Sequence, residues 1–301
     1  MNKKLFKIIV ILIVVVDIGF IASRLFLNNK TNKQPDASEF ASDGVTVNTS
    51  KVEGISYTEF YKDDGFKKPV IYLGHGLGNN KSSTYSLAAK LADNDYYVIC
   101  ADAYGHGDTE SSEFLSASEI IIETGKNLDI IFSHCESNEN ADFSKLGIGG
   151  FSLGAEVGYY YIAYGKYPVS VMCGCCGTPD FEELIGYNIA YSKYKYGKWK
   201  DVTDSSGKSA INSILRDNNP ISKIDNFIDV DMFFMIGEDD TTLPNDVSKS
   251  FIYDHIVGNN SQVKIYKQEH EFTDNNYNDM LDYFIQYLNW SYYLSGSELW
   301  V

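Results

Sequence analysis

The chain has 301 residues, of which 44% are hydrophobic and 14% aromatic, so one α/β domain with an insertion can bury a large core. Its formal net charge of -16 and its sequence pI of about 4.7 repel phosphate groups and anionic lipid headgroups. These values exclude nucleic acid as a partner, and they disfavour membrane binding through the body of the protein.

The first residues differ in composition from the rest of the chain. Three lysines within the first seven residues precede an apolar run at residues 8–22, which is interrupted by a single charge at Asp17. Positive residues before such a run keep that end in the cytoplasm, which predicts that the chain beyond the run is exported. No small-x-small cleavage signature follows the run, so we interpret residues 1–27 as an uncleaved membrane anchor. A cleaved signal sequence and a buried N-terminal core helix are the alternatives.

Residues 28–50 are rich in polar side chains and nearly lack large apolar ones, which predicts a solvated linker. From residue 51 to residue 301, strand-like and helix-like patterns alternate. Strands are expected at residues 52–61, 69–73, 96–101, 146–151, 169–173, 232–236 and 262–267, and helices at residues 85–91, 116–135, 155–164, 246–257 and 277–288. This alternation predicts a mostly parallel, doubly wound sheet, which binds ligands at the carboxyl ends of its strands.

The segment Gly150-Phe151-Ser152-Leu153-Gly154 lies between a predicted strand and a predicted helix. In such a strand-turn-helix the serine occupies a cramped turn, and the flanking glycines avoid collisions with the neighbouring strand and helix. The turn exposes the serine Oγ, and the backbone N–H of Leu153 then points toward an oxyanion on whatever the serine attacks. The bare pattern is weak, because short glycine-serine motifs also occur by chance.

A serine hydroxyl needs a base and an acid that orients the base, and both should come after the serine, each just after a strand. Asp240 and His270 occupy those positions. Asp239 competes with Asp240 for the acid role. The alternative interpretation is that Asp239 is a solvated loop carboxylate without a catalytic role. His255 is the other histidine after the acid, but it lies in a helical run, where a surface or core role is the better interpretation.

The spacing of Gly237, Asp240 and Pro244 resembles the arrangement around the acid in the α/β-hydrolase superfamily. Within this superfamily, the chain is most similar to small bacterial carboxylesterases with a His-Gly loop. In this chain the loop comprises residues 75–78. The resemblance implies that the backbone N–H of Leu77 is the second oxyanion donor, that His75 is structural, and that no cofactor is needed. We interpret His106 as a turn residue.

The predicted strands at residues 169–173 and 232–236 are separated by more residues than a crossover needs, which predicts a helical cap insertion at about residues 178–223. Its centre combines aromatic rings with the lysines Lys193, Lys195, Lys198 and Lys200. One interpretation is an amphipathic cap helix with its lysines in solvent and its rings packed beneath. The functional alternative is that rings line an acyl or sugar pocket and the lysines attract an anionic substrate or lipid. The candidate substrate-binding residues are Tyr187, Tyr191, Tyr194 and Trp199.

Five cysteines are present, and an exported protein with cysteines normally invites a search for disulfides. Cys100 and Cys173 fall in predicted core strands, where a reduced cysteine acts as a small apolar side chain. Cys173, Cys175 and Cys176 form a weak zinc pattern, because no second Cys or His pair stands at ligand spacing. The sequence predicts no metal.

The sequence predicts a membrane-tethered, outward-facing serine hydrolase that cleaves a carboxylic ester of a small molecule. Ser152 is the expected nucleophile, His270 the base and Asp240 the orienting acid. A peptidase or amidase would use the same residues. A non-catalytic binding module on a hydrolase scaffold is the alternative from another class.

Overall fold

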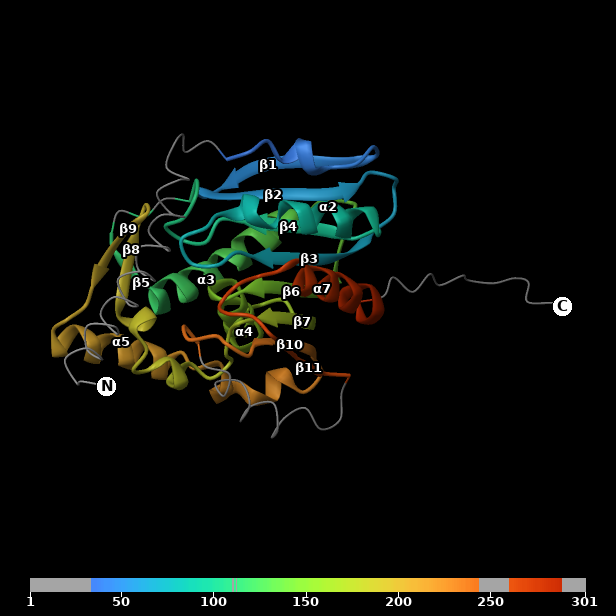
Figure 1. Ribbon diagram of the computed structural model, residues 1–301. Helices are drawn as coiled ribbons and strands as arrows, with labels where there is room; N and C mark the ends of the chain where they lie inside the picture. The colour runs from blue at the N-terminus through green and yellow to red at the C-terminus, as the bar shows by residue number, and fades with distance from the viewer. Residues whose placement is uncertain (1–33, 110, 112, 244–259, 289–301) are drawn as a thin grey trace, which may run out of the picture. The chain divides into compact units, whose positions relative to one another are not determined.

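The computed structural model describes residues 34–109, 111, 113–243 and 260–288. Its centre is a sheet of eight strands in the order β1-β2-β4-β3-β6-β7-β10-β11 (Figure 1). The strands are β1 (Val45–Val52), β2 (Ile55–Lys62), β3 (Lys68–Gly74), β4 (Tyr97–Ala101), β6 (Ala141–Phe151), β7 (Val169–Cys175), β10 (Asp231–Gly237) and β11 (Gln262–Tyr266). Pairing is antiparallel from β1 through β2 to β4, and parallel across the rest of the sheet.

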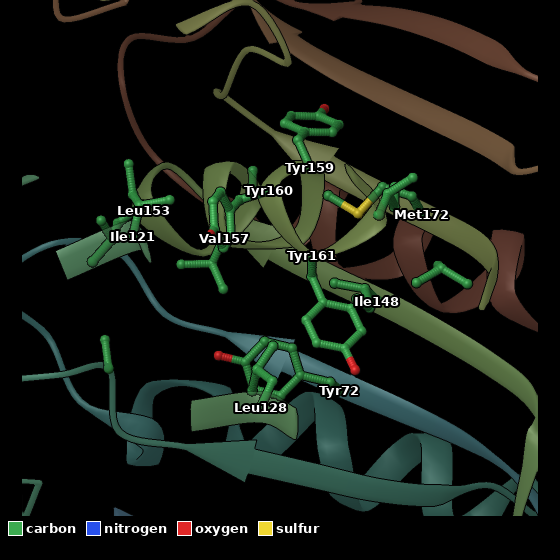
Figure 2. Packing of buried hydrophobic residues seen from close by; sticks show 14 of the residues in the cluster. Tyr72, Ile121, Leu128, Ile148, Leu153, Val157, Tyr159, Tyr160, Tyr161 and Met172 are labelled. Atoms are coloured by element: carbon green, nitrogen blue, oxygen red, sulfur yellow. The ribbon is translucent and has the colours of Figure 1, made fainter. Parts of the chain in front are cut away.

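Helices cover both faces of this sheet, because the central strands are apolar on both faces. Val70 and Tyr72 of β3 join the core cluster that contains residues of α3 and α4, whereas Ile71 and Leu73 join the cluster that contains residues of α2 and α7. The helices are α2 (Tyr85–Asp93), α3 (Ala117–Cys135), α4 (Leu153–Tyr164) and α7 (Asp274–Tyr287). Figure 2 shows the first cluster, in which aromatic residues of α4 pack near Tyr72 and Leu128. The predicted doubly wound, mostly parallel sheet is confirmed.

The predicted linker at residues 28–50 is wrong over its second half. A 3-10 helix, η1 (Ala37–Phe40), precedes β1, and β1 pairs with β2 along its whole length. The strand lies at the edge of the sheet and is only partly buried, so it needs few large apolar side chains. The polar composition of β1 is therefore similar to that of a solvated linker.

The predicted insertion is present, but its centre is not helical. After β7 come η3 (Phe181–Leu184), η4 (Asn188–Tyr191), β8 (Ser192–Lys195), β9 (Lys198–Asp201), α5 (Ser205–Asp217) and η5 (Pro220–Phe227). Strands β8 and β9 form a hairpin that extends a small sheet with β5 (Leu115–Ser116), apart from the main sheet (Figure 1). Tyr196 and Gly197 at its turn both have positive φ, as a two-residue hairpin turn requires. The predicted amphipathic helix over the lysine-rich segment is thus wrong.

Three further predictions lie outside the described residues: the anchor at residues 1–27, the helix at residues 246–257, and the position of His255. Among the helices that the structure describes, none combines the length and the apolar composition that crossing a membrane requires.

Candidate active site

Ser152 lies in the sharp turn between β6 and α4. Its φ is 50°, in the left-handed region that serine rarely adopts, and its backbone N–H donates to the Cys175 carbonyl oxygen at 2.8 Å. Strain of this kind persists only where the surroundings fix it, and it concentrates at functional sites. The turn holds the serine side chain at the carboxyl end of the central strand.

Glycines make the turn possible because the strand and the helix approach each other at backbone distance. A Cβ at Gly150 would overlap the backbone of Gly154, and a Cβ at Gly154 would overlap the carbonyl of Gly74 in β3. The predicted reason for the two glycines of the motif is confirmed.

His270 connects the serine to Asp240. Its Nε2 lies 2.9 Å from Ser152 Oγ, and its Nδ1 lies 2.7 Å from Asp240 Oδ2. With Nδ1 protonated, the ring donates to the carboxylate and accepts from the serine hydroxyl. The three side chains come from the loops after β6, β10 and β11, so the chain order brings them to one edge of the sheet.

The carboxylate of Asp240 is fixed by its own loop. The backbone N–H groups of Thr242 and Leu243 donate to Asp240 Oδ1 at 2.8 and 2.9 Å. Burial alone would raise the pKa of this carboxyl, but the hydrogen bond and charge of His270, together with these N–H groups, hold the pKa below its ordinary value. Asp239 is exposed to solvent. The structure therefore brings Asp240, and not its neighbour, to the histidine.

Two other histidines stabilise the loop that contains Leu77. His75 Nδ1 donates to the Gly76 carbonyl and its Nε2 accepts from the Ala103 N–H, at 2.9 and 3.0 Å. His106 Nε2 accepts from the Gly78 N–H at 3.1 Å. Burial lowers the pKa of both rings, and the pKa of His106 falls to about 3. Both histidines are neutral and join backbone groups of neighbouring loops through hydrogen bonds. The prediction of His106 as a turn residue did not include this contact.

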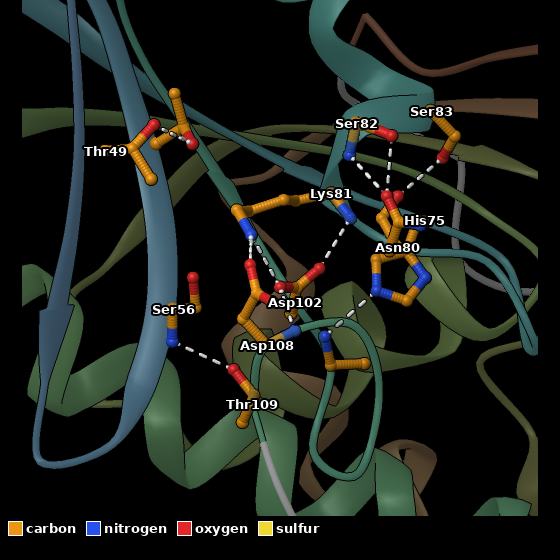
Figure 3. A network of polar contacts seen from close by, with 12 residues as sticks. Thr49, Ser56, His75, Asn80, Lys81, Ser82, Ser83, Asp102, Asp108 and Thr109 are labelled. Carbon is orange, nitrogen blue, oxygen red and sulfur yellow. Dashed lines mark hydrogen bonds and ion pairs between the residues drawn. The ribbon is translucent and has the colours of Figure 1, made fainter. Parts of the chain in front are cut away.

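A buried ion pair closes the base of the same loop. Lys81 Nζ lies 2.7 Å from Asp102 Oδ2 and 3.1 Å from Asp108 Oδ2 (Figure 3). Asp102 also accepts the backbone N–H groups of Lys81 and Asp108, and these contacts outweigh burial and lower its pKa. Sequence reasoning missed this network. The signal was available, since Lys81 and Asp102 come after two neighbouring parallel strands.

A small pocket opens beside Ser152, with a cavity volume of about 20 Å³. Leu77 and Leu153, the two expected oxyanion donors, both line it. Its wall is mainly aliphatic and includes Leu77, Leu153, Leu184, Ile189, Leu215 and Leu243. Room of this size fits about one or two water molecules.

None of the four predicted aromatic residues lines this pocket. Tyr191 donates to Asn212 Oδ1 at 2.9 Å, and Tyr194 is buried with its ring stacked on His106 at 4.3 Å between centroids. Trp199 packs edge-on against Tyr194 and is 40% exposed, and Tyr187 lies half-buried before η4. The pocket wall is aliphatic rather than aromatic, and Tyr194 joins the hairpin to the His106 loop.

Among the described residues of the pocket wall, Glu156 is the one carboxylate, and sequence reasoning missed it. It lies in the first turn of α4, four residues after the serine, and is 6% exposed. Burial raises the pKa of its carboxyl to about 8. The available signal was a single acidic residue in an otherwise apolar helical run.

All five cysteines are reduced and buried. Burial raises the pKa of Cys100 to about 12, so it behaves as a small apolar side chain. Within the described residues, Cys176, Asp240 and His270 place ligand atoms within 4.8 Å of one another. A metal there would have to replace the hydrogen bond between Asp240 and His270. The absence of a metal and of a cofactor remains a prediction.

No family model matches the chain. It is 24% identical over 160 residues to a Bacillus subtilis (strain 168) protein described as "Putative esterase YitV", and this match covers 48% of the chain and 59% of that relative. Pyrococcus horikoshii acylaminoacyl peptidase superposes with a TM-score of 0.64 at 16% identity, over 85% of this chain and 44% of that one. Acetyl xylan esterase 1 from Thermoanaerobacterium sp. JW/SL YS485 superposes with a TM-score of 0.58 at 14% identity, over 88% and 97%. The chain has the α/β-hydrolase fold.

Proposed function

We propose that this protein is a serine hydrolase that cleaves a carboxylic ester through an acyl-enzyme intermediate. The observation that carries the proposal is the continuous hydrogen-bonded chain from Ser152 through His270 to Asp240 at the end of the strained turn. A histidine placed in this way can take the serine proton, while the carboxylate holds it in the required tautomer.

The reaction proceeds in two half-reactions. Ser152 Oγ attacks the acyl carbon as His270 Nε2 accepts its proton, and the imidazolium then gives that proton to the departing alcohol. Water attacks the acyl-serine with the same histidine as base, which releases the acid and restores the serine. Asp240 stabilises the imidazolium in both steps. The backbone N–H groups of Leu77 and Leu153 hold the oxyanion, as their place beside Ser152 supports.

An amidase would use the same groups, so the leaving group decides the reaction class. Five of the similar structures are named peptidases or aminopeptidases and one is named an esterase, whereas the relative found by sequence is described as "Putative esterase YitV". We expect the kcat/KM for phenyl butanoate to be at least about 100-fold above that for the matching anilide. The reason is that the amine of an anilide must be protonated as it leaves, whereas phenolate can leave without a proton. Equal or better cleavage of the anilide would instead identify an amidase.

A binding module on the same scaffold is the alternative from another class. Such a module has no need to keep the serine, histidine and aspartate in hydrogen-bond contact, whereas a hydrolase does. The arrangement therefore favours the enzyme.

We also propose that the enzyme is held at the cell membrane, with the catalytic domain outside. The support is the sequence of residues 1–27, where lysines precede an apolar run. A secreted protein released by signal cleavage is the second arrangement that this sequence allows.

A further inference from the structure

Glu156 is a buried carboxyl group that the proposed mechanism does not use. It lines the pocket together with Ser152 and is 6% exposed, and burial alone shifts its pKa, with no contribution from a hydrogen bond or a charge of the described residues. Burying a carboxyl group without a protein partner costs free energy, so such groups are rare in folded proteins unless water, an ion or a ligand binds to them.

The surroundings of this carboxyl indicate what would complete it. Apart from Glu156, the described residues of the pocket wall are aliphatic except for the uncharged Ser118, Ser152 and Thr242, and they include no lysine, arginine or histidine. Burial alone raises the pKa of Glu156 to about 8, so this carboxyl group is mainly neutral at neutral pH when no cation is next to it. Its position in the first turn of α4 places it at the positive end of the helix dipole, which eases ionisation when a cation arrives.

The electrostatic field around the site favours cations as well. The loops that carry Asp240 and His270 also expose four carboxylates, Glu238, Asp239, Glu269 and Glu271. With the net charge of -16, these groups attract a positively charged substrate and repel an anionic one.

We infer that the pocket selects esters with a short acyl group that ends in a protonated amine, and that the Glu156 carboxylate is the counter-ion of this amine. The inference rests on the proposed ester hydrolysis and specifies its substrate class. Glu156 lies about one helical turn after Ser152 and lines the same pocket, so a short acyl group on the serine can reach its carboxyl group. When the ammonium enters, Glu156 releases its proton to solvent and the buried ion pair satisfies both groups.

Three phenyl esters of equal size test this inference: 3-aminopropanoate, butanoate and 3-hydroxypropanoate, which differ only in a terminal ammonium, methyl or hydroxyl group. We expect the wild-type kcat/KM for the amine ester to exceed that for butanoate by at least about tenfold, mainly through a lower KM. Glu156→Gln keeps the size of the side chain but not its charge. It should reduce this preference, measured as the ratio of the two kcat/KM values, at least about tenfold.

Glu139→Gln is the matched control, because it removes an exposed carboxylate and should leave the ratio unchanged. Glu156→Leu tests the same point in an apolar background that needs no hydrogen bond. If the ratio of kcat/KM for the amine ester to kcat/KM for butanoate is unchanged in both Glu156 variants, the inference is overturned. A preference for the hydroxyl ester that survives Glu156→Gln would also overturn it, because neutral hydrogen bonding would then suffice.

Failure of the proposed function is distinguishable from failure of this inference. If the folded wild-type protein hydrolyses none of the three esters, ester hydrolysis itself is wrong and the inference falls with it. If the wild-type protein hydrolyses butanoate but prefers neither polar ester, only the assignment of Glu156 is wrong.

Discussion

Asp239 and Asp240 are adjacent carboxylates with different surroundings. This difference identifies Asp240 as the acid that orients His270. Asp240 is buried, accepts two backbone N–H groups and bonds His270, whereas Asp239 is exposed. We expect Asp240→Asn to lower kcat about 10⁴-fold, because the amide favours the wrong histidine tautomer, and Ser152→Ala to lower it about 10⁶-fold. Asp239→Asn should lower it less than about threefold. Steady-state kinetics on butanoate esters measure all three, and a larger loss in Asp239→Asn would reassign the acid.

Glu156 also gives a prediction for stability. Its pKa is about 8 in the folded protein against an ordinary value of 4.5, so between these values the folded state binds more protons than the unfolded state. Raising the pH through this window therefore lowers the free energy of unfolding of the wild-type protein. Glu156→Gln lacks this loss, and from about pH 5.5 to about pH 7.5 it should gain about 2 kcal/mol relative to wild type. Urea unfolding at several pH values measures the difference, and parallel pH curves would show that Glu156 is ionised in the folded state.

The hairpin of β8 and β9 supports the proposed oxyanion loop from the side of the insertion. Tyr194 stacks on His106, and His106 accepts the N–H of Gly78, the residue after Leu77 in the chain. Tyr194→Ala should lower the free energy of unfolding by about 3 kcal/mol, because a large buried ring is lost. It should also lower kcat about tenfold, because the Leu77 N–H is displaced. Tyr187→Ala, at a half-buried position before η4, is the control. An unchanged kcat in Tyr194→Ala would show that the hairpin does not position the loop.

The elements that the sequence predicted well are those buried on both faces. Strands β3, β7 and β10 are continuous apolar runs, and their bounds agree with the prediction within about two residues. The sequence prediction missed β1, β5, β8 and β9. β1 is polar and only partly buried, β9 is exposed along its length, and β5 and β8 are short, so hydrophobic periodicity gives little signal for them. Tyr194 and Tyr196, which alternate with lysines and precede a glycine, were the available hairpin signal.

The candidate site shows the same division. Ser152, Asp240 and His270 come after strands in a fixed chain order, so the sequence predicts that they meet. Glu156 and the pair of Lys81 and Asp102 belong to no local pattern. Their burial depends on which loops and helices pack over them, and this is a property of the assembled fold.

At the scale of the whole molecule, the proposal places an acidic catalytic domain outside the cell on an N-terminal anchor. Protease added to intact cells should release a folded, active fragment that begins after residue 27, because only outward-facing chain is accessible. Immunoblotting of the membrane and medium fractions measures the release. Full-length protein in the cytosol would contradict export, and a mature N-terminus near residues 23–28 without added protease would contradict the anchor alone.

We expect Ser152 to be an activated nucleophile, and a fluorophosphonate probe tests this property directly. The probe reacts with a serine hydroxyl whose proton a neighbouring base removes, and the product is stable enough for peptide mass spectrometry. We expect the folded wild-type protein to be labelled at Ser152, Ser152→Ala to remain unlabelled, and His270→Ala to react at least about 100-fold more slowly. Folded wild-type protein that takes up no label, or takes it up at another residue, would show that Ser152 is not the activated nucleophile.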